Sequence, residues 1–405
     1  MPFYVGRVVD SEKELVIRTP ETFREKYNID VRTGHEVMAL DPAGERILAR
    51  RLADGAQQWV PYGQLLLATG AVPFCPDLHG AAARGIFGVN TLQAGIAIRR
   101  FIEKESPRQG VIVGGGYIGL EMAEALIRQG LAVTLVDREP QVMGTLDPDM
   151  GALVGEALRD IGVTIHSGES LVGFETARGR VTGIVTGERR LPADLVILGM
   201  GVRPNAKLAQ EAGIPLGEKG AIRANGRMET EVPGVWAAGD CAESFHLVSR
   251  RPFYIALGTV ANKHGRVAGI NITGGDALFP GVVGTAITKV CDLEVARSGL
   301  HEKELDRLGI DYATGRIESY THARYYPGAG PITVKLLAEK GSGRLLGGQI
   351  VGTAGAGKRI DIIATALHAG FTVEQLADLD LAYAPPFSPV WDPVAIAARE
   401  TAKHV

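Results

Sequence analysis

The stretch VIVGGGYIGLE, residues 111–121, decides the fold, because it joins an apolar run to a helical pattern through closely spaced glycines. Gly114, Gly116 and Gly119 give the spacing GxGxxG. In such a turn the first glycine permits a tight bend, the second lets the backbone approach a pyrophosphate, and the third allows close packing of helix on strand. The helix N-terminus then faces the phosphates. The stretch therefore predicts a dinucleotide-binding turn.

The flanking sequence strengthens this prediction, for which a bare GxGxxG is weak support. The turn follows an apolar run at Gly110–Val113, opens a helical pattern at Ile118–Gln129 and leads to a second apolar run at Ala132–Val136. Asp137 ends that run, where a carboxylate can accept a hydrogen bond from a ribose hydroxyl. Its charge favours NAD, although Arg138 beside it could stack on adenine or accommodate NADP. A glycine turn used only for packing is the alternative.

The bulk composition is that of a folded, soluble α/β enzyme with more than one domain. The 405 residues are 45% hydrophobic and 22% charged, with 53 glycines and a formal net charge of -3, so nucleic acid is not an expected partner. No apolar run is long enough to span a membrane, and no secretory signal is present. Cys75, Cys241 and Cys291 form no CxxC pair, so we expect no disulfide scaffold or metal site and a cytoplasmic location.

Other apolar segments divide the chain into two parts of different character. Short runs that are apolar on both faces predict further strands of a parallel sheet, at Gln64–Ala68, Asp194–Leu198 and Val235–Ala238. From about Gly284 onward, alternating segments predict an antiparallel sheet, at Thr285–Val290, Ile332–Ala338 and Leu345–Val351. A helix at about Lys358–His368 and a proline-rich tail follow. The C-terminal part is therefore expected to be a separate α+β domain.

Two strand-ending motifs flank the glycine-rich turn, one at Thr69 and Gly70 and the other at Asp240. With them the sequence resembles the two-dinucleotide flavoprotein reductases, the pyridine nucleotide–disulfide oxidoreductase superfamily. The resemblance implies that Asp240 hydrogen-bonds the ribityl chain of FAD. It also implies that Thr69, Gly70 and Gly258 lie at the cofactor. A helix cap or turn aspartate is the alternative for Asp240.

Four further runs narrow the resemblance to one subgroup. They are MPFYVG at 1–6, ANKHGR at 261–266, HARYYPG at 322–328 and AYAPPFS at 382–388. Together they resemble the coenzyme A–disulfide reductases, NADH oxidases and persulfide reductases, which use a single redox cysteine. The chain departs from that pattern at its start, because the first flavin-binding GxGxxG and the redox cysteine do not appear in it. By analogy we expect that cysteine just before Met1, and we expect Met1 to be an internal methionine of a longer protein.

The resemblance also implies a reaction in two halves. NAD(P)H passes a hydride to the flavin, and the electrons then reach a cysteine sulfur, oxidised or in a mixed disulfide with coenzyme A. Tyr325 and Tyr383 match two tyrosines that the partner subunit presents to that sulfur, which implies a homodimer. Tyr383 could instead be a core or interface aromatic, and Tyr326 could replace Tyr325.

The same resemblance implies roles for five further residues, in the turn and elsewhere in the chain. Tyr117 matches an aromatic gate over the flavin, or simply packs at the helix start. Ile118 belongs to the cofactor-binding turn. Glu121 matches a residue that holds the nicotinamide amide, or complements the helix dipole. Gly201 matches a loop at the nicotinamide, and Asn262 lies in a run near the substrate.

The predicted fold is α/β, with two Rossmann-like three-layer dinucleotide-binding domains and a C-terminal α+β dimerisation domain. We expect the FAD-binding domain, incomplete at its N-terminal strand, at residues 1–90 and 218–283. The NAD(P)-binding domain is expected at 91–217 and the dimerisation domain at 284–405.

The predicted function is FAD-dependent reduction of coenzyme A disulfide, or of a related disulfide or persulfide, by NAD(P)H. An NADH oxidase or peroxidase is one alternative. A ferredoxin reductase-like flavoprotein, which needs no cysteine, is another, but the run at 1–6 and the motifs around Tyr325 and Tyr383 argue against it. An inactive, truncated nicotinamide-binding dimer is the third.

Overall fold

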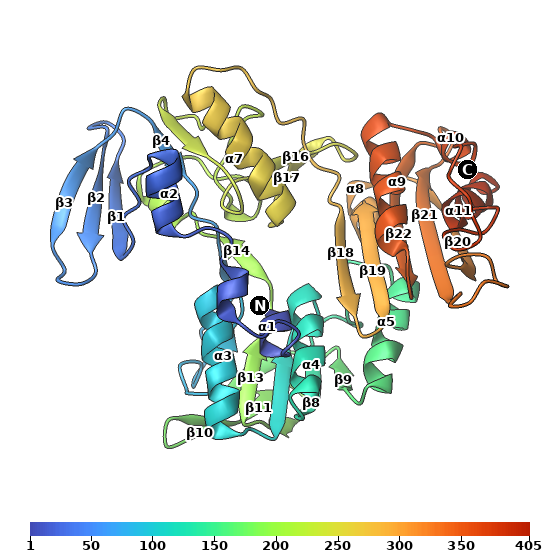
Figure 1. Cartoon of the computed structure of the whole chain (residues 1–405), viewed down its shortest axis with the longest axis horizontal. Coiled ribbons are helices and arrows are strands. Elements are labelled where there is room, and N and C mark those ends of the chain that lie inside the picture. Colours follow the sequence, from blue (N-terminus) through green and yellow to red (C-terminus); the bar gives the residue numbers. More distant parts are fainter.

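The computed structural model describes all 405 residues, and three regions can be followed along the chain in Figure 1. The middle region contains a parallel five-stranded sheet in the order β6-β13-β7-β8-β9. Its strands are β6 (Ile86–Gly88), β7 (Gln109–Val113), β8 (Ala132–Asp137), β9 (Thr164–Ser167) and β13 (Leu195–Leu198). Its helices are α3 (Leu92–Glu105), α4 (Tyr117–Arg128) and α5 (Pro148–Asp160). A small antiparallel sheet of β10 (Leu171–Ala177), β11 (Arg180–Thr186) and β12 (Arg190–Pro192) covers one side.

This parallel sheet forms because its strands are apolar on both faces, as the sequence predicts. Every residue of β13 is buried, and Ile112 of β7 and Leu135 of β8 are fully buried between the helices. Burial of each such side chain stabilises the fold by about 1.5–3 kcal/mol. The largest core cluster of the molecule, 27 buried residues, lies around this sheet and α4.

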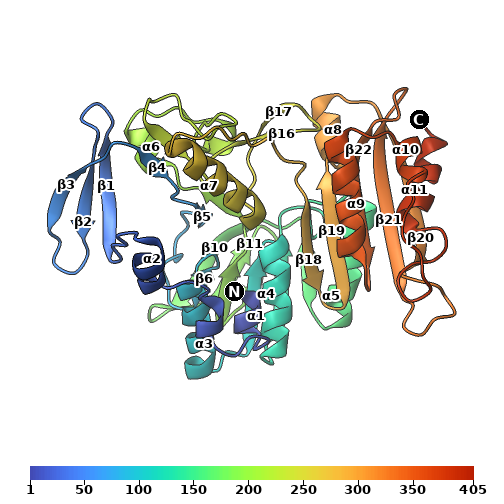
Figure 2. The same ribbon diagram turned by 45° about the horizontal axis from the view of Figure 1, so that its top comes forward.

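A second α/β region lies beside the first (Figure 2). Its centre is a parallel pair, β4 (Leu65–Leu67) and β15 (Val235–Ala237), which sequence analysis places in the FAD-binding domain. The rest of this region consists of α2 (Pro20–Tyr27), β1 (His35–Asp41), β2 (Arg46–Arg51), β3 (Gln57–Pro61), α6 (Lys207–Glu211), η2 (Glu218–Gly220), β16 (Ser244–His246), β17 (Arg251–Phe253) and α7 (Gly258–Ile272). The short helix η1 (Glu12–Leu15) instead contacts α3 of the middle region. The antiparallel sheet β1-β2-β3 has no counterpart among the predicted strands.

The predicted boundary between residues 90 and 91 needs a correction. Strand β6, at Ile86–Gly88, pairs in parallel with β13, so the nicotinamide sheet begins before residue 91. Helix α1 (Pro2–Val5) also packs on this region, because Val5 is fully buried in the core around α4. Two short strands, β5 (Ala71–Pro73) and β14 (Val202–Pro204), pair antiparallel and join the two regions.

The C-terminal region is the predicted antiparallel α+β domain. Its sheet has the order β18-β19-β22-β21-β20. The strands are β18 (Ala286–Val290), β19 (Leu293–Gly299), β20 (Tyr312–Tyr320), β21 (Pro331–Glu339) and β22 (Leu345–Gly352). The helices are α8 (Glu302–Leu308), α9 (Ala356–Ala369), α10 (Val373–Ala377) and α11 (Pro393–Ala402). Nowhere does the structure contain a helix with the length and apolarity needed to cross a membrane.

A buried lysine joins this C-terminal domain to the middle region through ion pairs. The Lys335 ammonium on β21 lies 3.2 Å from Asp147 and 2.8 Å from each of Asp149 and Glu302. Gln349 donates to Asp147 at 2.7 Å from the neighbouring strand. The Lys335 side chain is only 6% exposed, so its carboxylate partners are needed to offset the cost of burying its charge.

We expect Lys335→Met to lower the free energy of unfolding by about 3 kcal/mol, because clustered carboxylates lose their buried counter-charge. Urea denaturation of the full chain measures this. Lys303→Met is the matched control, because the Lys303–Glu139 pair across the same interface has a lysine that is 62% exposed. The control should cost less than about 1 kcal/mol. Equal losses in the two variants would contradict the role given to Lys335.

Candidate active site

The glycine-rich turn joins β7 to α4 where the sequence predicts it. Gly114 has a φ of 103°, and a Cβ there would lie 2.5 Å from the carbonyl oxygen of Gly199, so no side chain fits. A Cβ on Gly119 would collide with the carbonyl oxygen of Gly114. Gly116 is the N-cap of α4 and faces open space. Open space before free helix amides is what a pyrophosphate requires.

Asp137, at the end of β8, lies directly against this turn. Its Oδ2 accepts the Gly115 N–H at 2.6 Å, and its Oδ1 accepts the Glu139 N–H at 3.0 Å. The carboxylate is therefore fixed beside the turn by two backbone donors. The Arg138 side chain is 75% exposed and lies near Glu139. A 2′-phosphate at this edge would face a carboxylate held in place, with Arg138 as the adjacent counter-charge.

Three predicted residues lie near the start of α4. Tyr117 is largely buried, its hydroxyl has no hydrogen-bond partner, and burial raises the pKa of its phenol. Ile118 packs on the main core. Glu121 Oε1 accepts a hydrogen bond at 2.6 Å from the Thr288 hydroxyl on β18. Sequence reasoning missed Thr288, because no local pattern signals a contact with a residue 167 positions away.

The loop that contains Gly201 reaches the flavin-side motif. Gly201 has a φ of 89°, and its carbonyl accepts the Phe74 N–H at 2.9 Å. Asn205, just after β14, accepts a hydrogen bond from the Thr69 hydroxyl at 2.6 Å through its backbone carbonyl and donates its own N–H to the Gly70 carbonyl at 2.9 Å. The two predicted cofactor sites therefore share one wall.

Asp240 is an acceptor without a donor. Because β4 and β15 are adjacent and parallel, the turns that follow them meet at one edge of the sheet. Asp240 Oδ1 is buried there with no hydrogen-bond partner, and burial raises the pKa of its carboxyl group. A buried acceptor of this kind costs free energy until a donor arrives. The hydroxyls of a ribityl chain are such donors, so the residue fits FAD, and the absence of any backbone donor argues against a capping role.

Helix α7 begins beside this turn. Gly258 is its first residue and faces open space. A Cβ on Gly239 would lie 3.6 Å from the Ala261 side chain, which places the first turn of α7 against the Asp240 motif. The Asn262 side chain donates to the Gly258 carbonyl at 2.8 Å and is exposed.

Tyr325 and Tyr383 are adjacent, although 58 positions separate them in the sequence. The neighbouring Tyr325 phenol raises the pKa of Tyr383. Their side chains are 78% and 46% exposed on the surface of the C-terminal domain. The structure therefore brings the two predicted tyrosines together and presents both outward.

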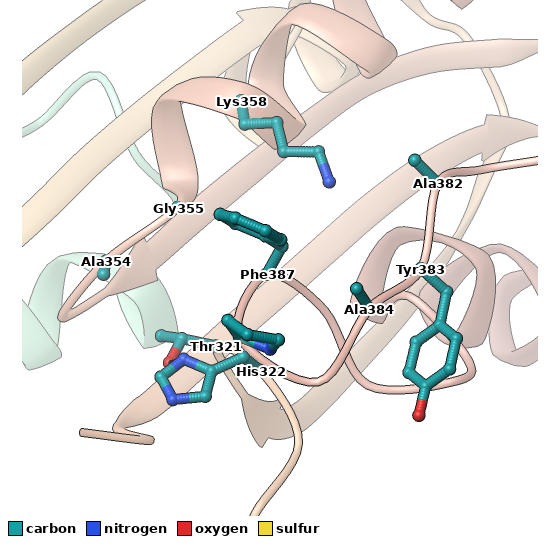
Figure 3. Close-up of a pocket in the computed structure, with 10 residues that line it drawn as sticks. Thr321, His322, Ala354, Gly355, Lys358, Ala382, Tyr383, Ala384 and Phe387 are labelled. Atoms are coloured by element: carbon teal, nitrogen blue, oxygen red, sulfur yellow. Dashed lines mark hydrogen bonds between the residues drawn. The ribbon is translucent and has the colours of Figure 1, made fainter. Parts of the chain in front are cut away.

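A pocket of about 670 Å³ opens beside Tyr383 (Figure 3). Figure 3 shows the side chains of Lys358, Phe387 and His322 around it. The complete lining is Thr321, His322, Ala354, Gly355, Lys358, Ala382, Tyr383, Ala384, Pro386 and Phe387. Sequence reasoning did not select Lys358 or His322, which become neighbours only through folding.

None of the three cysteines has surroundings that would stabilise a reactive thiolate. Cys241 is buried, and its thiol donates to the Leu67 carbonyl at 3.4 Å. Burial raises the pKa of the Cys291 thiol to about 11, which disfavours the thiolate. Cys75 is exposed in the segment after β5.

A glycine turn for a nicotinamide dinucleotide, a second turn with a buried aspartate, and an antiparallel C-terminal domain define a class of two-dinucleotide reductases. The chain belongs to the pyridine nucleotide-disulphide oxidoreductase family, whose model matches residues 4–265. The dimerisation domain of the same family matches residues 285–394. The predicted superfamily and fold class are thus confirmed, and this membership assigns FAD and NAD(P)H as cofactors.

Particular relatives narrow the class. The chain is 40% identical over 400 residues to the CoA-dependent NAD(P)H sulfur oxidoreductase of Pyrococcus abyssi, covering 98% of this chain and 88% of the relative. It is similar to the NAD-dependent persulfide reductase of A. fulgidus, with TM-score 0.95 and 39% identity, covering 98% and 74% of the two chains. It is also similar to the reduced CoADR-RHD protein of Bacillus anthracis, with TM-score 0.95 and 34% identity, covering 99% and 72%.

We expect Gly116→Ala and Gly119→Ala to separate binding from folding. Both should weaken NADH binding by about tenfold or more, because a methyl group stands between the turn and the pyrophosphate or displaces α4. Only Gly119→Ala should lower the melting temperature, because only its Cβ collides with backbone. Thermal unfolding and NADH titration measure the two effects. A Gly116→Ala protein that binds NADH normally would contradict the assignment of the turn.

Proposed function

We propose that this protein uses NADH, through bound FAD, to reduce a disulfide or persulfide of coenzyme A, and that it acts as a homodimer. The observation that carries the proposal is the adjacent, outward-facing pair Tyr325 and Tyr383 in a chain that also contains the fitted nicotinamide turn. The overall reaction with coenzyme A disulfide balances as one NADH and one proton reducing one disulfide to two thiols. When bound, FAD would accept the hydride and pass the electron pair to sulfur.

The residues of the nicotinamide domain would bind and orient NADH. Gly114–Gly119 would hold the pyrophosphate at the α4 N-terminus, and Asp137 would accept a hydrogen bond from the adenosine ribose. Glu121 would hold the nicotinamide amide with its remaining acceptor capacity, since Thr288 already fixes one of its oxygens. Tyr117 would shield the flavin site from water until the nicotinamide enters.

The flavin-side residues would hold FAD at its middle. Asp240 would accept hydrogen bonds from the ribityl chain with the oxygen that lacks a partner. Thr69 and Gly70 would form the adjoining wall, which Asn205 ties to the nicotinamide loop. Gly258 and Asn262 would contribute from the first turn of α7.

Tyr325 and Tyr383 would donate hydrogen bonds to the redox sulfur of the partner subunit, which stabilises a thiolate leaving group. Their exposure supports a role toward a second copy, and the match of residues 285–394 to a dimerisation domain supports the homodimer.

The decisive experiment measures free thiol, NADH oxidation and oxygen uptake together, with coenzyme A disulfide as oxidant. We expect two thiols to be released for each NADH oxidised. NADH oxidation that matches oxygen uptake, with no thiol released, would assign an oxidase instead. A purified protein without absorption in the flavin bands would favour the inactive nicotinamide-binding alternative.

Asp137→Ser should shift the coenzyme preference from NADH toward NADPH. The ratio of kcat/KM for the two coenzymes should change by about tenfold or more, because the carboxylate no longer repels a 2′-phosphate while Arg138 remains. Steady-state kinetics with each coenzyme measure the ratio. Glu139→Gln, two residues further along the chain, is the control and should leave the ratio of kcat/KM within about twofold. An unchanged ratio in Asp137→Ser would overturn the role of this residue.

Tyr383→Phe should lower kcat for disulfide reduction by about tenfold or more, because the thiolate loses a hydrogen-bond donor. NADH oxidation by ferricyanide, which needs only the nicotinamide and flavin sites, should stay within about twofold. Tyr326→Phe is the matched control beside Tyr325, since Tyr326 packs edge-on against His322 at a centroid distance of 5.7 Å. If Tyr326→Phe alone removes the activity, the assignment of Tyr325 is wrong.

A further inference from the structure

A buried ion pair, Arg359 and Asp392, lies in the same domain as the tyrosine pair. Arg359 of α9 is fully buried, and its Nε donates to both carboxylate oxygens of Asp392, at 3.2 and 3.0 Å. Asp392 is the N-cap of α11 and is 5% exposed. No sequence motif pointed to this pair, because its members lie in different helices 33 positions apart.

The pair ties together the two segments that carry the tyrosines. Arg359 Nη2 donates to the Thr321 carbonyl at 2.9 Å, where the Tyr325 loop begins. Asp392 Oδ2 accepts the Ser388 hydroxyl at 3.1 Å, in the segment that follows Tyr383. One guanidinium–carboxylate unit therefore holds both segments.

The two segments also contact one another through a backbone hydrogen bond. The Ala323 N–H donates to the Pro385 carbonyl at 3.1 Å. Tyr325 and Tyr383 themselves are 78% and 46% exposed, so the Tyr325 ring has little packing within this chain and the Tyr383 ring is only partly covered by it. Their relative position is set by the backbone of the two segments.

A buried ion pair contributes little net stability compared with apolar side chains of similar volume, because burying two charges costs about as much as their attraction returns. Its best-attested use is to specify one arrangement of the chain. Here the arrangement that depends on it is the approach of the Tyr325 and Tyr383 loops.

We propose that Arg359 and Asp392 are positioning residues for the reduction of the disulfide, because they hold Tyr325 and Tyr383 at the spacing that one sulfur requires. This inference rests on the proposed function. It adds that the step in which the disulfide is reduced depends on a buried ion pair outside both cofactor sites. The transfer of the hydride from NADH does not depend on this pair.

The test uses the full protein with Arg359→Gln and Asp392→Asn combined, so that neither charge is left buried alone. The double variant should reduce coenzyme A disulfide at least about tenfold more slowly, because a small misplacement of a catalytic group has large effects on rate. NADH oxidation by ferricyanide should stay within about twofold of the original protein. The matched control is Glu339→Gln with Arg344→Gln, an ion pair at the turn between β21 and β22 that should leave both activities unchanged.

A double-mutant cycle distinguishes positioning from general damage. In a protein that already carries Tyr325→Phe and Tyr383→Phe, the Arg359/Asp392 change should lower disulfide reduction by no more than about twofold, because the phenols it positions are gone. A further loss as large as in the original protein, or an equal loss with ferricyanide, would overturn the proposal.

A measurement that needs no enzymatic activity tests the positioning role even if the proposed function is wrong. Ultraviolet titration of phenol ionisation, taken as the difference between each protein and its version with both Tyr325→Phe and Tyr383→Phe, follows the ionisation of the two interacting phenols. The Arg359/Asp392 variant should return the Tyr383 pKa toward its ordinary value, because Tyr325 moves away. An unchanged titration with intact folding would refute the positioning role, whereas an original protein that releases no thiol would refute only the proposed function.

Discussion

Helix α4 packs onto strand β7 backbone against backbone, and the rest of the structure depends on that contact. A side chain on Gly119 would collide with the Gly114 carbonyl, and one on Gly114 would press on Gly199. Because neither position carries a side chain, α4 begins at its N-cap Gly116 beside open space, while the rest of the helix packs in the main core. One constraint thus creates both the phosphate-binding opening and the rigid helix behind it.

The same helix connects the domains. Glu121 accepts a hydrogen bond from Thr288, and Glu124 accepts the Cys291 N–H at 3.0 Å, both on the C-terminal side. At the other end of α4, Gln129 donates to the Val5 carbonyl of α1 at 3.0 Å. The nicotinamide helix is therefore held by the C-terminal domain and by α1 at once. The Lys335 cluster makes that arrangement firm, so NADH would meet a preorganised site.

The tyrosine pair follows a different physical logic. The phenols of Tyr325 and Tyr383 are exposed on the surface of the C-terminal domain, so they gain little from packing within this chain. In our proposal, the buried Arg359–Asp392 pair sets the relative position of the two tyrosines. Chemistry at an interface can in this way depend on charges that never touch the substrate.

Much of the fold was readable from sequence, because parallel strands buried on both faces give continuous apolar runs. The runs at β7, β8, β13 and β15 each lie within about a residue or two of their predicted bounds. The glycine turn and the start of the antiparallel domain were equally local signals. Strands β1–β3 were missed, because they are half-exposed and give no strong pattern.

Amino-acid order alone determined the nicotinamide turn, the acidic end of β8 and the family to which the chain belongs, because each is written in adjacent residues. Tertiary structure alone decided that Asp240 has a buried oxygen without a donor, that Thr288 fixes Glu121, and that Arg359 meets Asp392. Burial and contacts between distant residues arise only when the chain packs, so no local pattern could contain them.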